Sequence, residues 1–108
     1  MAFIYCPFLS DNVELTDERE RHIAETHPDL LPVQRDCIDE VLSDPDLVRR
    51  SARATNARLF SRRFGGAHGG KHVVVVVVSD PGSPSRHWVV TAYAARHAQE
   101  KDVLWKRN

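Results

Sequence analysis

The chain has 108 residues, which is room for one domain with one hydrophobic core. Its 42% apolar and 28% charged residues are the composition of an ordinary globular protein, and they exclude a disordered or fibrous chain. A formal net charge of zero argues against tight non-specific binding to nucleic acid, because neutralised phosphates supply most of that affinity.

The longest apolar run is the six valines from Val73 to Val78, far short of the roughly 20 residues that a membrane-spanning helix needs. Residues 1–14 begin with an apolar stretch that has no basic start and no small-residue cleavage site, so we interpret them as folded protein and not as a signal peptide. We expect a cytoplasmic protein in which Cys37 is a reduced, buried thiol. A disulfide between Cys6 and Cys37 is the alternative.

Residues 15–46 are predicted to be helical. Thr16 is a suitable N-cap, acidic residues follow it, and the helix should run to about Thr26 and end at His27 because Pro28 follows. A second helix is predicted after residues 30–32, with a buried face that ends before residues 44–46. Its apolar positions recur with helical spacing, at Val33, Cys37, Ile38, Val41 and Leu42.

The period changes to two from Leu47 onward, which predicts strands. These are Leu47 to Ser51, Arg58 to Phe64, Lys71 to Ser79 and His87 to Ala95, with a glycine-rich hairpin loop over 65–70. The valine run predicts a central strand with apolar side chains on both faces. The first strand has an alternative as an extended turn. In the last strand, strict alternation places Val89, Thr91 and Tyr93 on one face and Trp88, Val90 and Ala92 on the other.

Together these elements predict a single α+β domain over residues 1–108, with two helices packed on one face of an antiparallel sheet. The sheet is expected to span residues 47–95 and to have four strands, with a fifth as an alternative. Residues 96–108 form a tail that should pack back as a short strand or clasp.

Charge is divided between the two halves of the chain. Residues 1–46 hold twelve acidic against three basic residues, a net of −9, and residues 47–108 hold the reverse, a net of +9. This asymmetry favours a polyanionic partner for the basic half. The alternative is that the halves pack together and neutralise each other.

Two histidines are the first candidates for chemistry. His22 and His27 lie about 140° apart on the predicted helix, but the turn at Pro28 is able to redirect the second ring. Imidazole exchanges protons near neutral pH, as attack by a ribose 2′-hydroxyl on the adjacent phosphate requires. The alternative is that His22 is solvated and His27 caps the turn.

The strand residues supply candidate phosphate contacts. Guanidinium groups suit a phosphate that gains charge in its transition state, and hydroxyls donate to its oxygens. We expect Arg62 and Arg63 to act with Thr91 and Tyr93, and expect RNA-binding contacts from Arg49, Arg50, Ser51 and Lys71, with the basic residues close together once the strands pair. Solvation of an exposed sheet face and ordinary strand propensity are the alternatives.

No metal or cofactor is expected. His68 and His72 are four residues apart beside glycines, but they straddle a junction between a loop and a strand, where helical spacing has no meaning. The glycine loop also lacks the order of a phosphate-binding P-loop, and no serine stands in a nucleophile-elbow motif.

Taken in order, these motifs resemble phage-associated members of the barnase–EndoU–colicin–RelE-like (BECR) nuclease superfamily. The resemblance covers roughly residues 13–105. It rests on residues 15–19, 22–23, 27–28, 44–48 and 51 and on the Val-Val-Thr-Ala-Tyr segment over 89–93. It implies two helices before a four-stranded antiparallel sheet, in agreement with the pattern above.

The resemblance also implies a metal-independent endoribonuclease that leaves a 2′,3′-cyclic phosphate. His22 or His27 would take the 2′-hydroxyl proton, the other histidine or Tyr93 would protonate the leaving oxygen, and Arg62 and Arg63 would stabilise the transition state. The acidic first half departs from a nuclease that holds RNA unaided, which favours a partner such as an antitoxin or immunity protein. The alternatives are a non-catalytic RNA- or protein-binding module and a homodimer that pairs through exposed strand edges.

Overall fold

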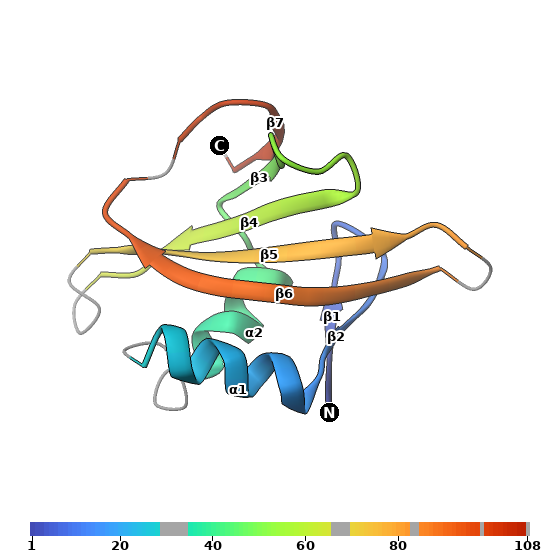
Figure 1. Cartoon of the computed structure of the whole chain (residues 1–108). Coiled ribbons are helices and arrows are strands. Elements are labelled where there is room, and N and C mark those ends of the chain that lie inside the picture. Colours follow the sequence, from blue (N-terminus) through green and yellow to red (C-terminus); the bar gives the residue numbers. More distant parts are fainter. Residues whose placement is uncertain (29–34, 66–69, 83–84, 98, 108) are drawn as a thin grey trace.

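The computed structural model describes residues 1–28, 35–65, 70–82, 85–97 and 99–107. In this part of the chain, two helices lie below a seven-stranded mixed sheet with the strand order β1-β2-β6-β5-β4-β3-β7 (Figure 1). The elements are β1 (Ala2–Cys6), β2 (Asp11–Leu15), α1 (Asp17–Thr26), α2 (Arg35–Ser43), β3 (Leu47–Arg50), β4 (Ala57–Arg63), β5 (His72–Asp80), β6 (Arg86–Ala95) and β7 (Val103–Lys106). The predicted start of the second helix and most of the glycine loop lie outside the described residues.

Helix α1 begins and ends where the local sequence predicts. The Thr16 hydroxyl accepts a hydrogen bond from the backbone N–H of Arg19, which satisfies one of the free donors at the helix start. At the other end the N–H of His27 donates to the carbonyl of Ile23 over 2.7 Å, and Pro28 prevents a further turn. Ile23 is the buried residue of this helix, and it anchors α1 beside β6.

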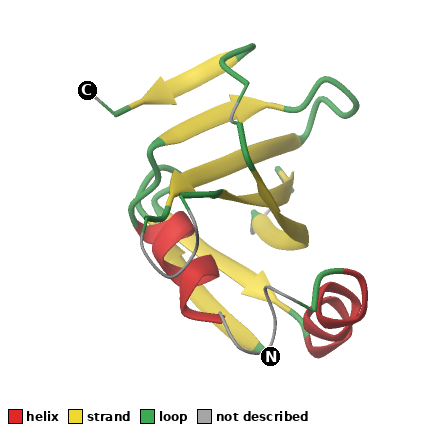
Figure 2. Cartoon of the chain, turned by 90° about the vertical axis from the view of Figure 1, so that its left-hand side faces the viewer, coloured by secondary structure: helices red, strands yellow, loops and turns green. Residues whose placement is uncertain are grey.

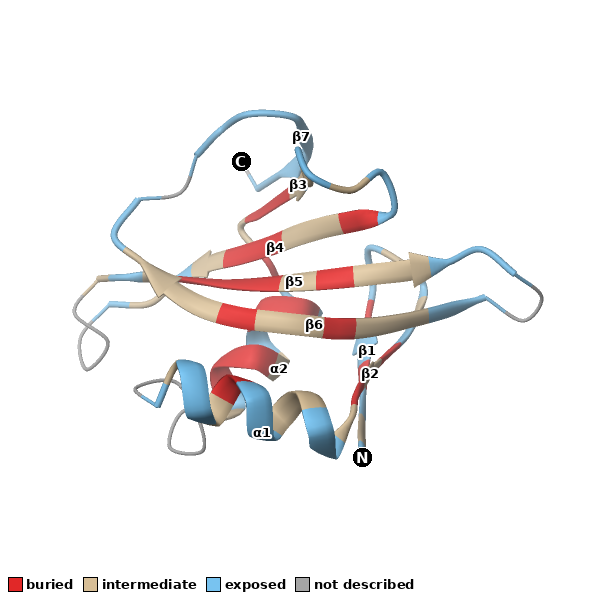
Figure 3. Cartoon of the chain, in the orientation of Figure 1, coloured by how far each residue is buried: buried red, intermediate tan, exposed pale blue. Residues whose placement is uncertain are grey.

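Helix α2 supplies the larger helical contribution to the core. Its buried residues are Cys37, Ile38, Val41 and Leu42, the broad apolar face that their spacing predicts. They pack beneath β4 and β5. Figure 2 shows both helices on the same side of the sheet, and Figure 3 shows the buried bands running across the strands above them. The prediction of an α+β domain with both helices on one face is confirmed.

Strands β3 to β6 form an antiparallel meander with β5 near its centre. Phe60, Val75 and Ala92 are fully buried on the side that faces the helices. Val74 and Val76 alternate with them and point to the opposite face. The predicted central strand with apolar side chains on both faces is confirmed.

Strict alternation along the last strand is wrong. Val76 pairs with Thr91, but Val77 pairs with Val89, so the register shifts and Val90 is an extra residue in β6. A bulge of this kind reverses the phase of a strand. As a result Val89 is fully buried in the core, while Thr91 points to the opposite face.

The predicted sheet of four or five antiparallel strands is also wrong. Residues 2–15 form an antiparallel hairpin, β1–β2, and β2 lies parallel to β6 through the pair Glu14 and Trp88. Arg86 adds a bidentate contact to the Glu14 carboxylate, at 2.7 and 3.2 Å. In Figure 1 this hairpin runs steeply across the direction of the other strands. The N-terminal segment is therefore part of the sheet.

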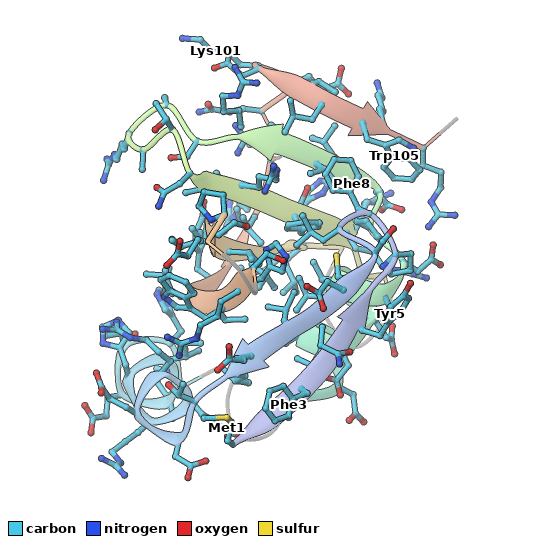
Figure 4. All side chains as sticks on the ribbon, turned by 90° about the vertical axis from the view of Figure 1, so that its right-hand side faces the viewer. Met1, Phe3, Tyr5, Phe8, Lys101 and Trp105 are labelled. Carbon is cyan, nitrogen blue, oxygen red and sulfur yellow. The ribbon has the colours of Figure 1, made fainter. Side chains whose placement is uncertain are left out.

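The predicted clasp at the C-terminus is confirmed as β7, which pairs antiparallel with β3. Arg107 ties its end to the carboxylates of Asp44 and Asp46. All four residues of β7 are exposed, and so are Phe3 and Tyr5 on β1 at the opposite edge of the sheet (Figure 4). Neither described helix is long and apolar enough to cross a membrane.

Candidate functional site

A groove of about 840 Å³ lies over the sheet face opposite the helices. Its floor is apolar and comes from the meander. The floor residues are Leu59 on β4, Val74, Val76 and Val78 on β5, and Val90 on β6. Residues 49–54 line one side of the groove, and residues of the segment 95–102 also line it.

Four cationic residues line the groove. Arg49 and Arg50 come from β3, Arg53 from the turn after it, and Lys101 from the segment before β7. None of the four forms an ion pair with a carboxylate in the described ranges, and Asp102 is the one acidic residue of the described lining. Cations without carboxylate partners beside an apolar floor attract an anion that carries apolar or aromatic groups.

The hydroxyls of Thr91 and Tyr93 also line the groove, both from β6. The His27 ring, at the end of α1, lies against the Tyr93 ring with 6.2 Å between centroids and a tilt of 41°. The edge of β6 is open at this point because β2 pairs with β6 only at Trp88. The structure therefore brings both predicted hydroxyl residues to the groove and places His27 against one of them, Tyr93.

His22 is placed differently. His22 is exposed on α1. Its backbone carbonyl accepts a hydrogen bond from the Thr26 hydroxyl. Among the described residues, the His22 ring neither lines the groove nor contacts the Tyr93 ring. The two imidazoles thus do not stand side by side.

Arg62, Arg63 and Lys71 are not among the described residues that line the groove. Arg62 donates to the carboxylate of Asp44 over 2.8 Å, and the Arg63 guanidinium donates to the carbonyl of Gly70 over 3.3 Å. Lys71 is exposed before β5 begins. Arg62 and Arg63 are therefore held by other contacts, and Lys71 lies outside the groove lining.

The strand register explains this separation. Leu47 pairs with Ser61 and Arg50 pairs with Arg58, so β3 and β4 run in opposite directions. Arg62 therefore lies at the end of the pair that is distant from Arg50, about 13 Å along the strand from Arg58. The expectation that all the basic residues lie close together is wrong, because it assumed a register that the sequence does not specify.

Six polar groove residues escaped the sequence analysis: Arg53, Ser61, His97, Gln99, Lys101 and Asp102. Arg53 continues a basic run that begins at Arg49, which is a signal that the sequence does carry. His97, Gln99 and Lys101 line the groove because β7 pairs with β3. No local sequence pattern predicts this pairing.

The residues that the structure describes form neither a metal-binding cluster nor a thiol with a lowered pKa. No cluster of three or more metal-binding side chains occurs among the residues that the structure describes, and His68 lies outside them. Burial raises the pKa of the Cys6 thiol and of the Cys37 thiol. A raised pKa leaves fewer thiolates, the nucleophilic form of cysteine.

Thr91 and Tyr93 thus line a basic groove with an apolar floor and His27 lies against Tyr93, and this combination suits an extended, single-stranded polyanion with flat apolar groups. A search of protein-family models, of curated proteins and of solved structures finds no match to this chain.

Proposed function

We propose that the groove binds single-stranded RNA and that the chain cleaves it without a metal ion. The observation that carries this proposal is the contact between the His27 and Tyr93 rings at the edge of a groove lined by four cations without described carboxylate partners. An apolar floor favours unpaired bases, which stack on aromatic and apolar surfaces, over a duplex that hides its bases.

In the proposed reaction His27 takes the proton of a ribose 2′-hydroxyl, whose oxygen attacks the adjacent phosphorus. The bond from phosphorus to the 5′-oxygen breaks, and Tyr93 donates its phenolic proton to that leaving oxygen. The products are a 2′,3′-cyclic phosphate and a free 5′-hydroxyl. Arg49, Arg50 and Arg53 hold the phosphates and offset the charge of the transition state.

The test is incubation of the purified chain with end-labelled single-stranded RNA in EDTA. We expect cleavage with cyclic-phosphate ends, and a loss of rate of about 100-fold or more in His27→Ala and Tyr93→Phe, the usual size of a general acid–base contribution. His22→Ala should retain nearly the parent rate, because the structure places that side chain on the exposed surface of α1. A parent chain that cuts no RNA would refute the proposed ribonuclease activity.

A second candidate is a binding module that holds RNA without cutting it. The engagement of Arg62 by Asp44 favours it, because that arginine belongs to the catalytic set that the BECR resemblance implies. RNA binding that survives His27→Ala, in a parent that does not cleave, would select this candidate. Membership of the BECR superfamily and an inhibitory partner protein both stay proposals, supported by residues 22–28 and 89–93 and by the acidic first half.

A further inference from the structure

A second cavity, of about 380 Å³, lies where the turn after β1 meets the loop between β3 and β4. Its lining combines cations, a hydroxyl and apolar side chains: Phe8, Arg50, Thr55, Ala57, Arg58 and Leu104. Arg50 also lines the groove, so the two spaces adjoin at that residue. The volume is in the range of small-molecule sites.

The two arginines of this cavity face each other across neighbouring strands. Arg50 on β3 pairs directly with Arg58 on β4. Like charges in such a position destabilise a sheet, and neither guanidinium forms an ion pair with a carboxylate in the described residues. A bound anion would offset this repulsion, because each guanidinium presents several donors that match a phosphate.

A chain of hydrogen bonds holds Arg58 in place. Its guanidinium donates to the Ser79 hydroxyl over 3.2 Å, and the Ser79 oxygen lies 2.7 Å from Nδ1 of His87. Nε2 of the same ring is 3.4 Å from the Asp11 carboxylate. With the ring proton on Nε2, Arg58 donates to Ser79 and Ser79 donates to Nδ1 of His87, so the hydrogen bonds from Arg58 to His87 run without a conflict.

Ser79, His87 and Asp11 are the residue types of a hydrolase triad, but their arrangement here suits positioning. The Ser79 oxygen already accepts a hydrogen bond from Arg58. Ser79 lines neither this cavity nor the groove. These hydrogen bonds therefore fix one donor of the Arg58 guanidinium. The rest of that guanidinium lines the cavity together with Arg50 and Thr55.

We propose that this cavity binds the phosphate of a nucleoside monophosphate, with the Arg50–Arg58 pair as the phosphate clamp and Phe8 beside the base. The Phe8 side chain is exposed at 37%, and its ring is held edge-on against Phe60 with 5.8 Å between centroids. An aromatic ring fixed at the mouth of a phosphate site offers the base a stacking surface.

The test is calorimetric titration of the full chain with adenosine 5′-monophosphate, with adenosine and inorganic phosphate as separate arms. We expect saturable binding of the monophosphate, weaker binding of inorganic phosphate and none of adenosine. Arg58→Gln should weaken monophosphate binding about tenfold, the size of one charge-assisted contact. Arg53→Gln, in the groove alone, and Arg86→Gln, paired with Glu14, are the matched controls and should bind as the parent does.

Two further variants separate the site from a folding defect. Thr55→Ala, in an exposed turn, should also weaken binding while the far-ultraviolet dichroism stays unchanged. Ser79→Ala should weaken binding and Ser79→Thr should restore it, as a positioning hydroxyl requires. An equal loss of monophosphate affinity in Arg58→Gln and Arg86→Gln, or no binding of the monophosphate by the parent, would overturn the proposed phosphate site. Because no RNA is used, failure of RNA cleavage leaves this result intact.

Discussion

Asp44 is the residue on which two cations converge. Arg62 and Arg107 donate to its carboxylate, and these hydrogen bonds lower the pKa of Asp44 below its ordinary value. A lowered pKa in the folded state stabilises the fold above the unfolded pKa of about 4, and this contribution is lost as the pH falls through the folded value. The ion pairs are exposed to water, so the effect should be screened by salt.

We predict that Asp44→Asn lowers the urea midpoint of unfolding at pH 7, that the difference from the parent shrinks as the pH falls below about 4, and that it disappears below the lowered folded pKa, where the parent carboxylate is protonated as well. Denaturation curves between pH 2 and pH 7 measure this. Glu25→Gln is the control, because the Glu25 carboxylate forms no ion pair with the described residues. A pH profile of Asp44→Asn that runs parallel to the parent would contradict the role of Asp44.

Residue types alone identified about half of the candidate site. His27, Thr91 and Tyr93 carry groups whose chemistry is visible in the sequence, and the structure places Thr91 and Tyr93 in one groove with His27 against Tyr93. Arg62 shows the limit of this approach, because a guanidinium is equally suited to a phosphate and to a nearby carboxylate such as Asp44. Which of the two it meets depends on register, and register is a property of two strands together.

Elements with strong local signals were predictable. Thr16 and Pro28 define α1, and the valine run defines β5, because caps, prolines and β-branched residues act on their own backbone. Strand β1 was missed although Ile4 and Cys6 are buried at alternate positions. The outward-facing residues between them are apolar or aromatic, so the polar half of the alternation is absent.

The C-terminal strand β7 is an element whose removal should be informative. The Asp102 carbonyl accepts a hydrogen bond from the N–H of Arg50, and β7 pairs with β3 beyond it. These contacts hold His97, Gln99, Lys101 and Asp102, which line the groove. We predict that a chain ending at residue 102 binds single-stranded RNA about tenfold more weakly than the parent, through the loss of ordered charge-assisted contacts.

Fluorescence anisotropy with a labelled RNA measures that loss. Lys101→Gln in the full chain is the comparison, because it removes the charge of one groove residue and leaves β7 paired with β3. We expect the truncation to weaken binding more than this single change does. Equal affinities for the truncated and the parent chain would show that residues 97–102 do not contribute to the bound state.

At the scale of the whole molecule, the net charge of zero conceals a local excess of cations. Four of them, Arg49, Arg50, Arg53 and Lys101, line one groove, while the pairs Arg35–Asp39, Arg86–Glu14 and Arg107–Asp44 account for much of the remaining charge. The pairs Arg86–Glu14 and Arg107–Asp44 neutralise charge between the two halves of the chain, and the four groove cations keep no described carboxylate. Those four cations are the ones that the proposed polyanion would meet.

We predict a shallow salt dependence for RNA binding. Each phosphate neutralised on a single strand contributes about −0.7 to the slope of log affinity against log salt, so four contacts give about −3. Arg53→Gln should make the slope shallower by about 0.7, and Arg86→Gln should leave it unchanged. Titrations at several salt concentrations measure both slopes, and identical slopes for Arg53→Gln and the parent would contradict the groove as the binding surface.

The single residue pair that joins β2 to β6, Glu14 and Trp88, also constrains the order in which the sheet is assembled. Strands β3 to β6 pair with their neighbours in the chain, so they close short loops, whereas the Glu14–Trp88 pair spans about two thirds of the chain and carries a larger entropic cost. Because the hairpin precedes β6 in the chain, we expect it to join the sheet after the meander has formed. We also expect the inner side chains Val13 and Leu15 to stay open to water until β6 is in place.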